Sequence, residues 1–255
     1  MMSINRSLVY GAVVAALGFG SAALAGEGHG HAPHWGYSGE AGPAAWGALD
    51  TNFKTCSVGK EQSPIDLKAA KNSELADVEI HYSEAPLNIV NNGHTIQVNF
   101  PEGNYATIGG VKYNLLQYHF HTTSEHTLDG QSFPLEAHLV HKTDDGKLGV
   151  IGVFMKEGAE NPALAAVWEN MPKEAGTVEK ADIKINPAQL LPTTLTYYNY
   201  AGSLTTPPCS EGVNWMVMTT PVEVSSGQVQ AFAAIFPQNN RPVQALNERT
   251  VLIEQ

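Results

Sequence analysis

Two short segments of the sequence space their histidines as a metal site would. His119 and His121 are two residues apart, and Glu136 and His138 repeat that spacing further along the chain. The residues between them are apolar, which is typical of β-strands. Residues at i and i+2 of a strand project from the same face. We therefore expect His119 and His121 to point together, and His138 to share a face with Glu136 and Val140.

A turn signal predicts that these strands pair. Asp129-Gly130 lies near the middle of the stretch that separates them, which favours an antiparallel pair with His138 opposite His119 and His121. Three neutral imidazoles suit Zn²⁺, and a tetrahedral ion with three protein ligands keeps its fourth position for water, as in catalytic zinc sites. A His-x-His pair also arises by chance, so this interpretation needs the third histidine and its neighbours.

Gln117 and Glu136 provide those neighbours. Each precedes a proposed ligand by two residues on the same strand face. From there its side-chain oxygen can accept the ring N–H that faces away from the metal and so fix the tautomer. His141 lies on the opposite face of its strand, so we exclude it as a ligand. Packing alone would rarely produce the whole combination.

The elements that must position these residues are mostly strands. Alternating apolar residues at 78–82 and 96–100 predict half-buried strands, and continuous apolar runs at 148–155 and 213–218 predict strands buried on both faces. Turn dipeptides such as Asn92-Gly93 favour antiparallel connections. We predict a mostly β fold with short α-helices, built as one domain around a large, twisted, mainly antiparallel sheet.

Helices are few. Asn161-Pro162 can start a short one that runs to Met171, and Ser225 with Gln228 forms a capping-box pattern ahead of a second. Nothing indicates βαβ units, which disfavours a dinucleotide-binding fold.

The composition and net charge of the chain limit its fold class and the kinds of partner that it can bind. The 255 residues are 43% hydrophobic and 15% charged, enough for one domain with a substantial core. Because 25 Asp and Glu oppose 14 Lys and Arg, the formal charge is −11 and phosphate backbones are repelled on average. We do not expect nucleic acid as a partner.

The N-terminus reads as an export signal. Arg6 precedes an apolar stretch that closes with Ala23-Leu24-Ala25, so residues 1–25 are interpreted as a signal peptide and the protein as periplasmic or secreted. An uncleaved anchor is the alternative, although glycines interrupt the stretch. Residues 26–33 form a Gly/His-rich leader, interpreted as a flexible terminus whose His29 and His31 could bind metal weakly. No later stretch is apolar enough to span a membrane.

Cys56 and Cys209 are the two cysteines of the chain. An even count in an exported protein predicts a disulfide that closes a very long loop. Two unpaired buried thiols are the alternative, because sequence alone cannot bring their Cα atoms within bonding distance.

The residues resemble the α-class carbonic anhydrases over nearly all of 34–255. Together the matching segments are specific, although any one could be coincidence: His34-Trp35-Gly36-Tyr37, Gln62-Ser63-Pro64-Ile65-Asp66, Asn92-Gly93-His94, Gln117 to His121, Ser124-Glu125-His126, Glu136 to His141, Gly202-Ser203-Leu204-Thr205-Thr206-Pro207-Pro208 and Asn240-Arg241-Pro242. The resemblance implies a roughly ten-stranded sheet with zinc at the base of a conical cleft, and His119, His121 and His138 as its ligands.

The implied activity is the reversible hydration of carbon dioxide to bicarbonate and a proton by zinc-bound hydroxide. In this reading Thr205 accepts a hydrogen bond from the hydroxide and donates its own to Glu125. Alone, Thr205 would be read as a turn residue and Glu125 as a solvated acid. His94 falls where the family has its proton shuttle, after a turn that leaves a side chain free to rotate; a solvated turn histidine is the alternative.

The resemblance also implies the lining of the cleft. An apolar wall for carbon dioxide maps to Val140, Val150, Leu204, Val213 and Trp215, of which Val140 alone was already placed beside His138 by strand parity. For the others, ordinary core packing explains the sequence equally well. Polar positions that order water and substrate map to Tyr37, Asn92, Gln97 and Thr206. His126 and His141 match buried structural histidines of the family.

Other functions compete with this one. A non-catalytic carbonic-anhydrase-like binding domain is the first alternative, although all three ligand histidines are present. An exported zinc-binding protein led by His29 and His31 is the second, and it predicts several metal ions per chain. The enzyme reading predicts carbon dioxide and bicarbonate as substrates and anions and sulfonamides as inhibitors. A homodimer is left open.

Overall fold

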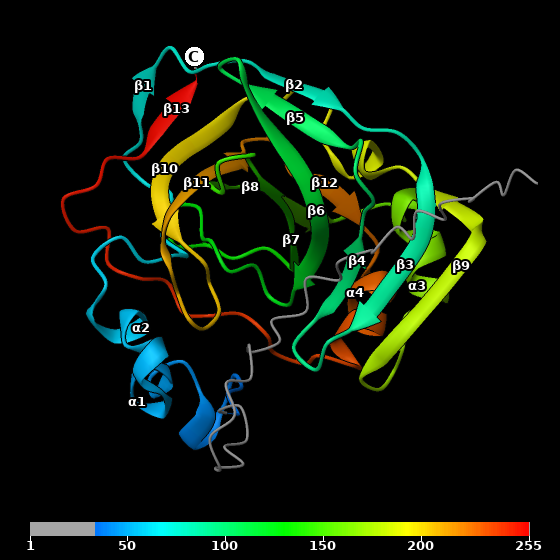
Figure 1. Ribbon diagram of the computed structural model, residues 1–255, viewed down its shortest axis with the longest axis horizontal. Helices are drawn as coiled ribbons and strands as arrows, with labels where there is room; N and C mark the ends of the chain where they lie inside the picture. Colours follow the sequence, from blue (N-terminus) through cyan, green and yellow to red (C-terminus); the bar gives the residue numbers. More distant parts are fainter. Residues whose placement is uncertain (1–33, 255) are drawn as a thin grey trace, which may run out of the picture. The chain divides into compact units, whose positions relative to one another are not determined.

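A computed structural model describes residues 34–254. The segments predicted as signal peptide and leader lie outside these residues. The described part contains one thirteen-stranded sheet, in the order β1-β13-β10-β11-β8-β7-β6-β4-β3-β9, with β12 beside β8 and the β2–β5 pair beside β6. Most neighbours are antiparallel, and parallel pairs occur at β1–β13, β11–β8 and β12–β8. Figure 1 shows the strong twist of the sheet. The mostly β prediction is confirmed.

The strands range in length from three residues in β1 and β13 to eleven in β6. Their bounds are β1 Lys71–Ser73, β2 Val78–His81, β3 Ala85–Asn91, β4 Ile96–Asn99, β5 Tyr105–Ile108, β6 Val111–His121, β7 Leu135–Lys142, β8 Leu148–Glu157, β9 Gly176–Ile185, β10 Tyr197–Ser203, β11 Glu211–Met218, β12 Val222–Val224 and β13 Leu252–Glu254.

The predicted strand types agree with the burial. β2 and β4, which overlap the alternating segments at 78–82 and 96–100, alternate between more and less buried residues. β8 and β11, which overlap the apolar runs at 148–155 and 213–218, are buried over most of their length. β8 lies between β7 and β11, and β7 lies between β6 and β8, so both strands are paired along both edges. The burial of successive side chains shows that both strands are also covered on both faces of the sheet. Strands covered on both faces are mostly apolar, and any polar side chain buried in one needs a bonded partner.

Short helices lie outside the sheet. They are η1 Gly39–Ala41, α1 Trp46–Leu49, η2 Thr51–Phe53, α2 Thr55–Val58, η3 Pro162–Leu164, α3 Ala165–Glu169, η4 Pro187–Leu190 and α4 Ser226–Ala233, where η marks a 3₁₀ helix. α4 begins with the predicted capping box, in which Ser225 Oγ accepts the Gln228 N–H at 3.2 Å. The helix predicted from Asn161 is divided into η3 and α3. Figure 1 shows α3 and α4 near β3 and β9.

The sheet separates two apolar clusters, one on each face. On β11, Met216 belongs to the larger cluster while Trp215 and Val217 belong to the smaller, and on β8 Ile151 and Val150 divide in the same way. This division follows from the two-residue period of a strand. Most core side chains of the two clusters therefore face opposite sides of one sheet.

A disulfide joins Cys56 of α2 to Cys209, which lies three residues after Thr206. The bond spans 153 residues of sequence, with 5.0 Å between the two Cα atoms. Both cysteines pack with Trp46 in a third apolar cluster. Within the described residues, no helix is long and apolar enough to cross a membrane.

Candidate metal centre

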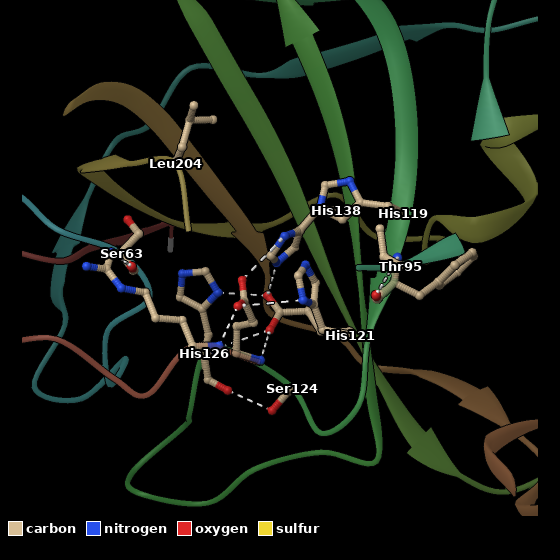
Figure 2. Close-up of polar contacts among 12 residues, drawn as sticks. Ser63, Thr95, His119, His121, Ser124, His126, His138 and Leu204 are labelled. Atoms are coloured by element: carbon tan, nitrogen blue, oxygen red, sulfur yellow. Dashed lines mark hydrogen bonds and ion pairs between the residues drawn. The ribbon is translucent and has the colours of Figure 1, made fainter. Parts of the chain in front are cut away.

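The pairing of β6 with β7 brings three histidines together. His119 lies directly opposite His138 in the register, and His121 lies opposite Glu136. The ring centroids are 5.0 Å apart for His119 and His121, 5.3 Å for His119 and His138, and 4.5 Å for His121 and His138. One nitrogen from each ring lies within 4.8 Å of the others. Figure 2 shows the three rings close together at these strands.

Each ring has its other nitrogen bonded to the protein. His119 Nδ1 lies 2.8 Å from Gln117 Oε1, and His138 Nε2 lies 3.0 Å from Glu136 Oε1. These are the two partners that the strand spacing predicts. A hydrogen bond at one ring nitrogen fixes the tautomer and leaves the other nitrogen with a free lone pair. His119 therefore presents Nε2 to the centre, and His138 presents Nδ1.

The third partner is Asn239, which the sequence analysis missed. Its carbonyl oxygen lies 2.7 Å from His121 Nδ1. Any residue type supplies a main-chain carbonyl, so no pattern could have marked this one, although Asn239 directly precedes a segment that carries the family resemblance. The Asn239 side chain also bonds the Thr122 N–H and the carbonyls of His94 and Phe120.

The donor set fits a cation. His121 Nε2 is buried and has no hydrogen-bond partner among the described residues, which would be costly in the absence of a ligand. Burial, reinforced by the neighbouring histidines, holds the pKa of His119 well below its usual range, and burial also lowers the pKa of His121. Both rings are therefore neutral near pH 7, the form that coordinates metal. Three imidazole nitrogens suit Zn²⁺.

Glu136 is a fully buried carboxylate. Its Oε2 accepts the backbone N–H groups of Glu125 and His126 at 2.8 and 2.9 Å, and its Oε1 bonds His138 and His126. Burial by itself raises the pKa of this carboxyl, but His126 and His138 outweigh burial and hold the pKa well below its usual range. These four contacts also explain why His126, Glu136 and His138 lie close enough to resemble a second metal site.

Glu125 lies on the other side of the ring of His138. Its Oε1 accepts the Arg241 N–H at 2.7 Å, and its Oε2 lies 3.9 Å from His138 Nδ1. Oε2 is buried, and within residues 34–254 it has no hydrogen-bond partner. Thr205 is 5% exposed, and the structure forms no bond between it and Glu125. The predicted Thr205 to Glu125 bond stays a prediction.

The residues predicted as an apolar wall come together. Val150, Val213 and Trp215 are members of the smaller cluster, and Val140 and Leu204 pack against it. The Trp215 ring centroid lies 4.8 Å from that of His138. This cluster therefore borders the histidines, whereas the larger one lies on the other face of the sheet.

Two of the predicted polar positions, Asn92 and Gln97, lie in or directly after the turn between β3 and β4. Asn92 Oδ1 accepts the N–H groups of His94 and Thr95, both at 3.0 Å, and Gly93 has the positive φ of 86° that such a turn needs. On β4, Gln97 pairs directly with His119, and its Oε1 accepts from Asn92 Nδ2 at 3.4 Å.

His94 is stacked rather than free. Its ring lies parallel to Trp35, with 3.6 Å between centroids and 7° between planes, and it is 6.5 Å from Tyr37. Partial burial, and then the nearby His34, lower the pKa of His94. Burial, and then Glu125, raise the pKa of Tyr37 well above its usual range. The role of Trp35 was missed because stacking joins two segments far apart in sequence.

Thr206 lies in the turn that carries the disulfide. Its carbonyl accepts the Cys209 N–H at 2.8 Å. This bond and the disulfide hold the segment that includes Leu204 and Thr205 against α2.

Known proteins share this sequence and fold. A family model described as eukaryotic-type carbonic anhydrase matches residues 41–255. A carbonic anhydrase of Nostoc sp. is 45% identical and covers 86% of this chain and 85% of its own. The structure of an α-carbonic anhydrase from Thermovibrio ammonificans with the inhibitor sulfanilamide is similar, with a TM-score of 0.84, 46% identity and coverage of 87% of this chain and all of that one. A relative with another name, dioscorin dioA3 of Dioscorea japonica, is 36% identical and covers 82% and 81%. The chain therefore belongs to the eukaryotic-type, or α-class, family of carbonic anhydrase enzymes.

Proposed function

We propose that the protein catalyses the reversible hydration of carbon dioxide to bicarbonate and a proton, with Zn²⁺ held by His119, His121 and His138. One observation carries the proposal. Each of the three rings has one nitrogen bonded to the protein and the other turned to a common point, and that of His121 is buried without a partner. Zinc held by three imidazoles lowers the pKa of water, an effect for which carbonic anhydrase is itself the standard example.

Glu125 and Thr205 select what faces the histidines. Glu125 Oε2 is a buried acceptor without a donor, and an ionised carboxylate can only accept. The Thr205 O–H is the donor we assign to it. The Thr205 hydroxyl oxygen then offers only a lone pair toward the three histidines. A molecule bound there is favoured if its reacting atom carries a hydrogen that it can donate to this oxygen.

The apolar wall would hold carbon dioxide. This substrate has no hydrogen-bond donor, so an apolar surface beside His138 retains it without competing for the polar groups. Val140, Val150, Leu204, Val213 and Trp215 form that surface. Thr206, Tyr37, Asn92 and Gln97 would order water and the departing bicarbonate.

His94 would carry the proton to solvent. The Asn92-capped turn sets its backbone, and the Trp35 stack gives its ring a resting place at the edge of the site. An imidazole titrates close enough to neutrality to accept and release a proton in each cycle.

Inhibitors and location follow from the same comparison. We infer that anions and sulfonamides bind at the three histidines, as sulfanilamide inhibits the Thermovibrio ammonificans enzyme. A buried disulfide agrees with an oxidising compartment, so we propose a periplasmic or secreted protein whose residues 1–25 are removed, whose residues 26–33 are a leader and whose residues 34–255 are the catalytic domain.

Stopped-flow carbon dioxide hydration tests the proposal. We expect activity that a zinc chelator removes and added Zn²⁺ restores, with one tightly bound zinc per chain by metal analysis. A folded, metal-loaded protein without chelator-sensitive hydration would instead support a binding domain. Two or more tight ions that disappear on deletion of residues 26–33 would support a zinc-binding protein.

A further inference from the structure

A buried chain of hydrogen bonds leads away from the candidate metal centre. It starts at Glu136 Oε1, which lies 2.7 Å from His126 Nδ1, and continues from His126 Nε2 to Tyr200 Oη at 2.6 Å and from Tyr200 Oη to Ser63 Oγ at 2.8 Å. All four side chains are at most 2% exposed. Figure 2 shows His126 between the metal-site histidines and Ser63.

The far end of the chain reaches the segment that carries Thr205. The Ser203 N–H donates to Ser63 Oγ at 3.0 Å, and the Ser63 N–H donates to Ser203 Oγ at 2.9 Å. Ser203 ends β10, directly before Leu204 and Thr205. The chain therefore connects His138 on β7 to the same loop from which Thr205 is proposed to act.

The donors and acceptors run in one direction. Glu136 is a carboxylate and accepts, so His126 carries its hydrogen on Nδ1 and has a lone pair on Nε2. Tyr200 then donates to Nε2, and burial raises the pKa of this phenol well above its usual range, so it keeps its hydrogen. Ser63 donates to the phenol oxygen and accepts from Ser203. If Tyr200 instead donated to Ser63, Ser63 Oγ would accept hydrogen bonds from both Tyr200 and Ser203, and its own hydrogen would have no partner.

We propose that His126, Tyr200 and Ser63 are positioning residues that orient Glu136 and thereby fix the tautomer of His138 in which Nδ1 faces the metal. The effect of this tautomer on zinc binding rests on the proposed function. Without the Tyr200 hydroxyl, His126 Nε2 is a buried acceptor without a donor. If the ring changes tautomer to correct this, Nδ1 directs a lone pair at Glu136 Oε1. In both cases the carboxylate is less well held, and its bond to His138 weakens.

The chain supplies a matched control. Tyr82 Oη bonds His141 Nε2 at 2.5 Å, on the opposite face of β7 from His138. Tyr82→Phe and Tyr200→Phe each remove one hydroxyl and one tyrosine–histidine hydrogen bond, so both should lower the Tm. Only Tyr200→Phe interrupts the chain to Glu136.

The first measurement is zinc release from the holoenzyme into excess chelator. We expect Tyr200→Phe to release zinc about 10-fold faster than wild type, the lower end of the range for partners of metal ligands because this bond lies one step further out. Tyr82→Phe should release zinc at the wild-type rate, and Ser63→Ala should lie between the two. Equal release from Tyr200→Phe and Tyr82→Phe would overturn the proposal, because it would show a loss of stability alone.

The second measurement needs no metal. Ring ¹⁵N shifts of the metal-free protein report tautomers directly. We expect hydrogen on Nδ1 of His126 and on Nε2 of His138 in wild type and Tyr82→Phe, and a mixture at both rings in Tyr200→Phe. Ser63→Ala gives the same comparison if Tyr200→Phe does not fold. A wild type without zinc would contradict the proposed function, whereas unchanged tautomers in the variants would contradict this inference.

Discussion

The two faces of β7 carry histidines of equal burial and different chemistry. His138 and His141 are three residues apart, and each is 1% exposed. His138 faces two other imidazoles and the carboxylates of Glu125 and Glu136. His141 has one side-chain partner, the hydroxyl of Tyr82.

Burial alone therefore does not make a histidine a ligand. Burial lowers the pKa of His141 to about 4, so this ring is as neutral as a metal ligand must be. Among residues 34–254, however, no group of three or more candidate metal ligands includes His141. The strand period sends one face of β7 toward the polar centre and the other toward the larger apolar cluster. The comparison predicts that substitutions on one face of β7 change metal binding and activity, whereas substitutions on the other face change only the stability of the fold.

Removal of a ligand should have the largest effect. We expect His138→Ala to lose both tight zinc binding and carbon dioxide hydration. Removing one ligand should cost about 3–4 kcal/mol of binding free energy, or roughly 10²–10³-fold in zinc affinity. His141→Ala should keep one zinc per chain and lose stability only. Metal analysis after dialysis against a chelator distinguishes them. Zinc lost from both variants would show that the two faces are not independent.

A substitution in the larger apolar cluster should lower stability and leave zinc binding unchanged. Leu139 is fully buried between His138 and Val140, on the face of the larger cluster. Leu139→Ala is expected to cost about 2–5 kcal/mol of unfolding free energy, since it leaves a cavity. Zinc stoichiometry in the folded protein should stay at one. Val140→Ala, on the metal face, is the matched control and should affect hydration more than the Tm.

The pH dependence of stability should carry the signature of His141. Its pKa is about 4 in the folded state and about 6.5 when unfolded, so the unfolded chain binds more protons between these values. This contribution is fully present above pH 6.5 and is lost as the pH falls toward 4, at most about 3 kcal/mol. Denaturant titrations should show a shallower loss over this window in His141→Asn than in wild type. Parallel curves for the two proteins would contradict the assignment.

The smallest effect on catalysis should come from a substitution at His94, the proposed proton shuttle. In weak buffer, His94→Ala is expected to lower kcat by about 10-fold while kcat/KM is nearly kept, because the interconversion of carbon dioxide and bicarbonate precedes proton transfer to solvent. Zinc content should not change, and imidazole in solution should restore much of the turnover. Full turnover in dilute buffer, or a loss that imidazole never rescues, would remove His94 as the shuttle.

Local rules were sufficient for much of the candidate site. The spacing of Gln117, His119 and His121 on one strand, and of Glu136 and His138 on the next, predicted which side chains share a face and which partner bonds each ring. Those relations, which cover the partners of His119 and His138 but not that of His121, depend on a two-residue period that every strand obeys. The Asp129-Gly130 turn signal then sufficed to pair the strands antiparallel. The capping box at Ser225 was equally local, and α4 begins there.

Tertiary structure decided the contacts between distant segments. The carbonyl of Asn239 reaches His121 across 118 residues, Tyr200 reaches His126 across 74, and Ser63 reaches Tyr200 across 137. A main-chain carbonyl carries no sequence signal, and a serine or tyrosine forms such bonds in many settings. Strand order and loop paths determine which of these groups meet, and these depend on the packing of the whole sheet. The sequence by itself determined the three histidines and the strand faces that carry them, whereas the folded chain decided what surrounds them.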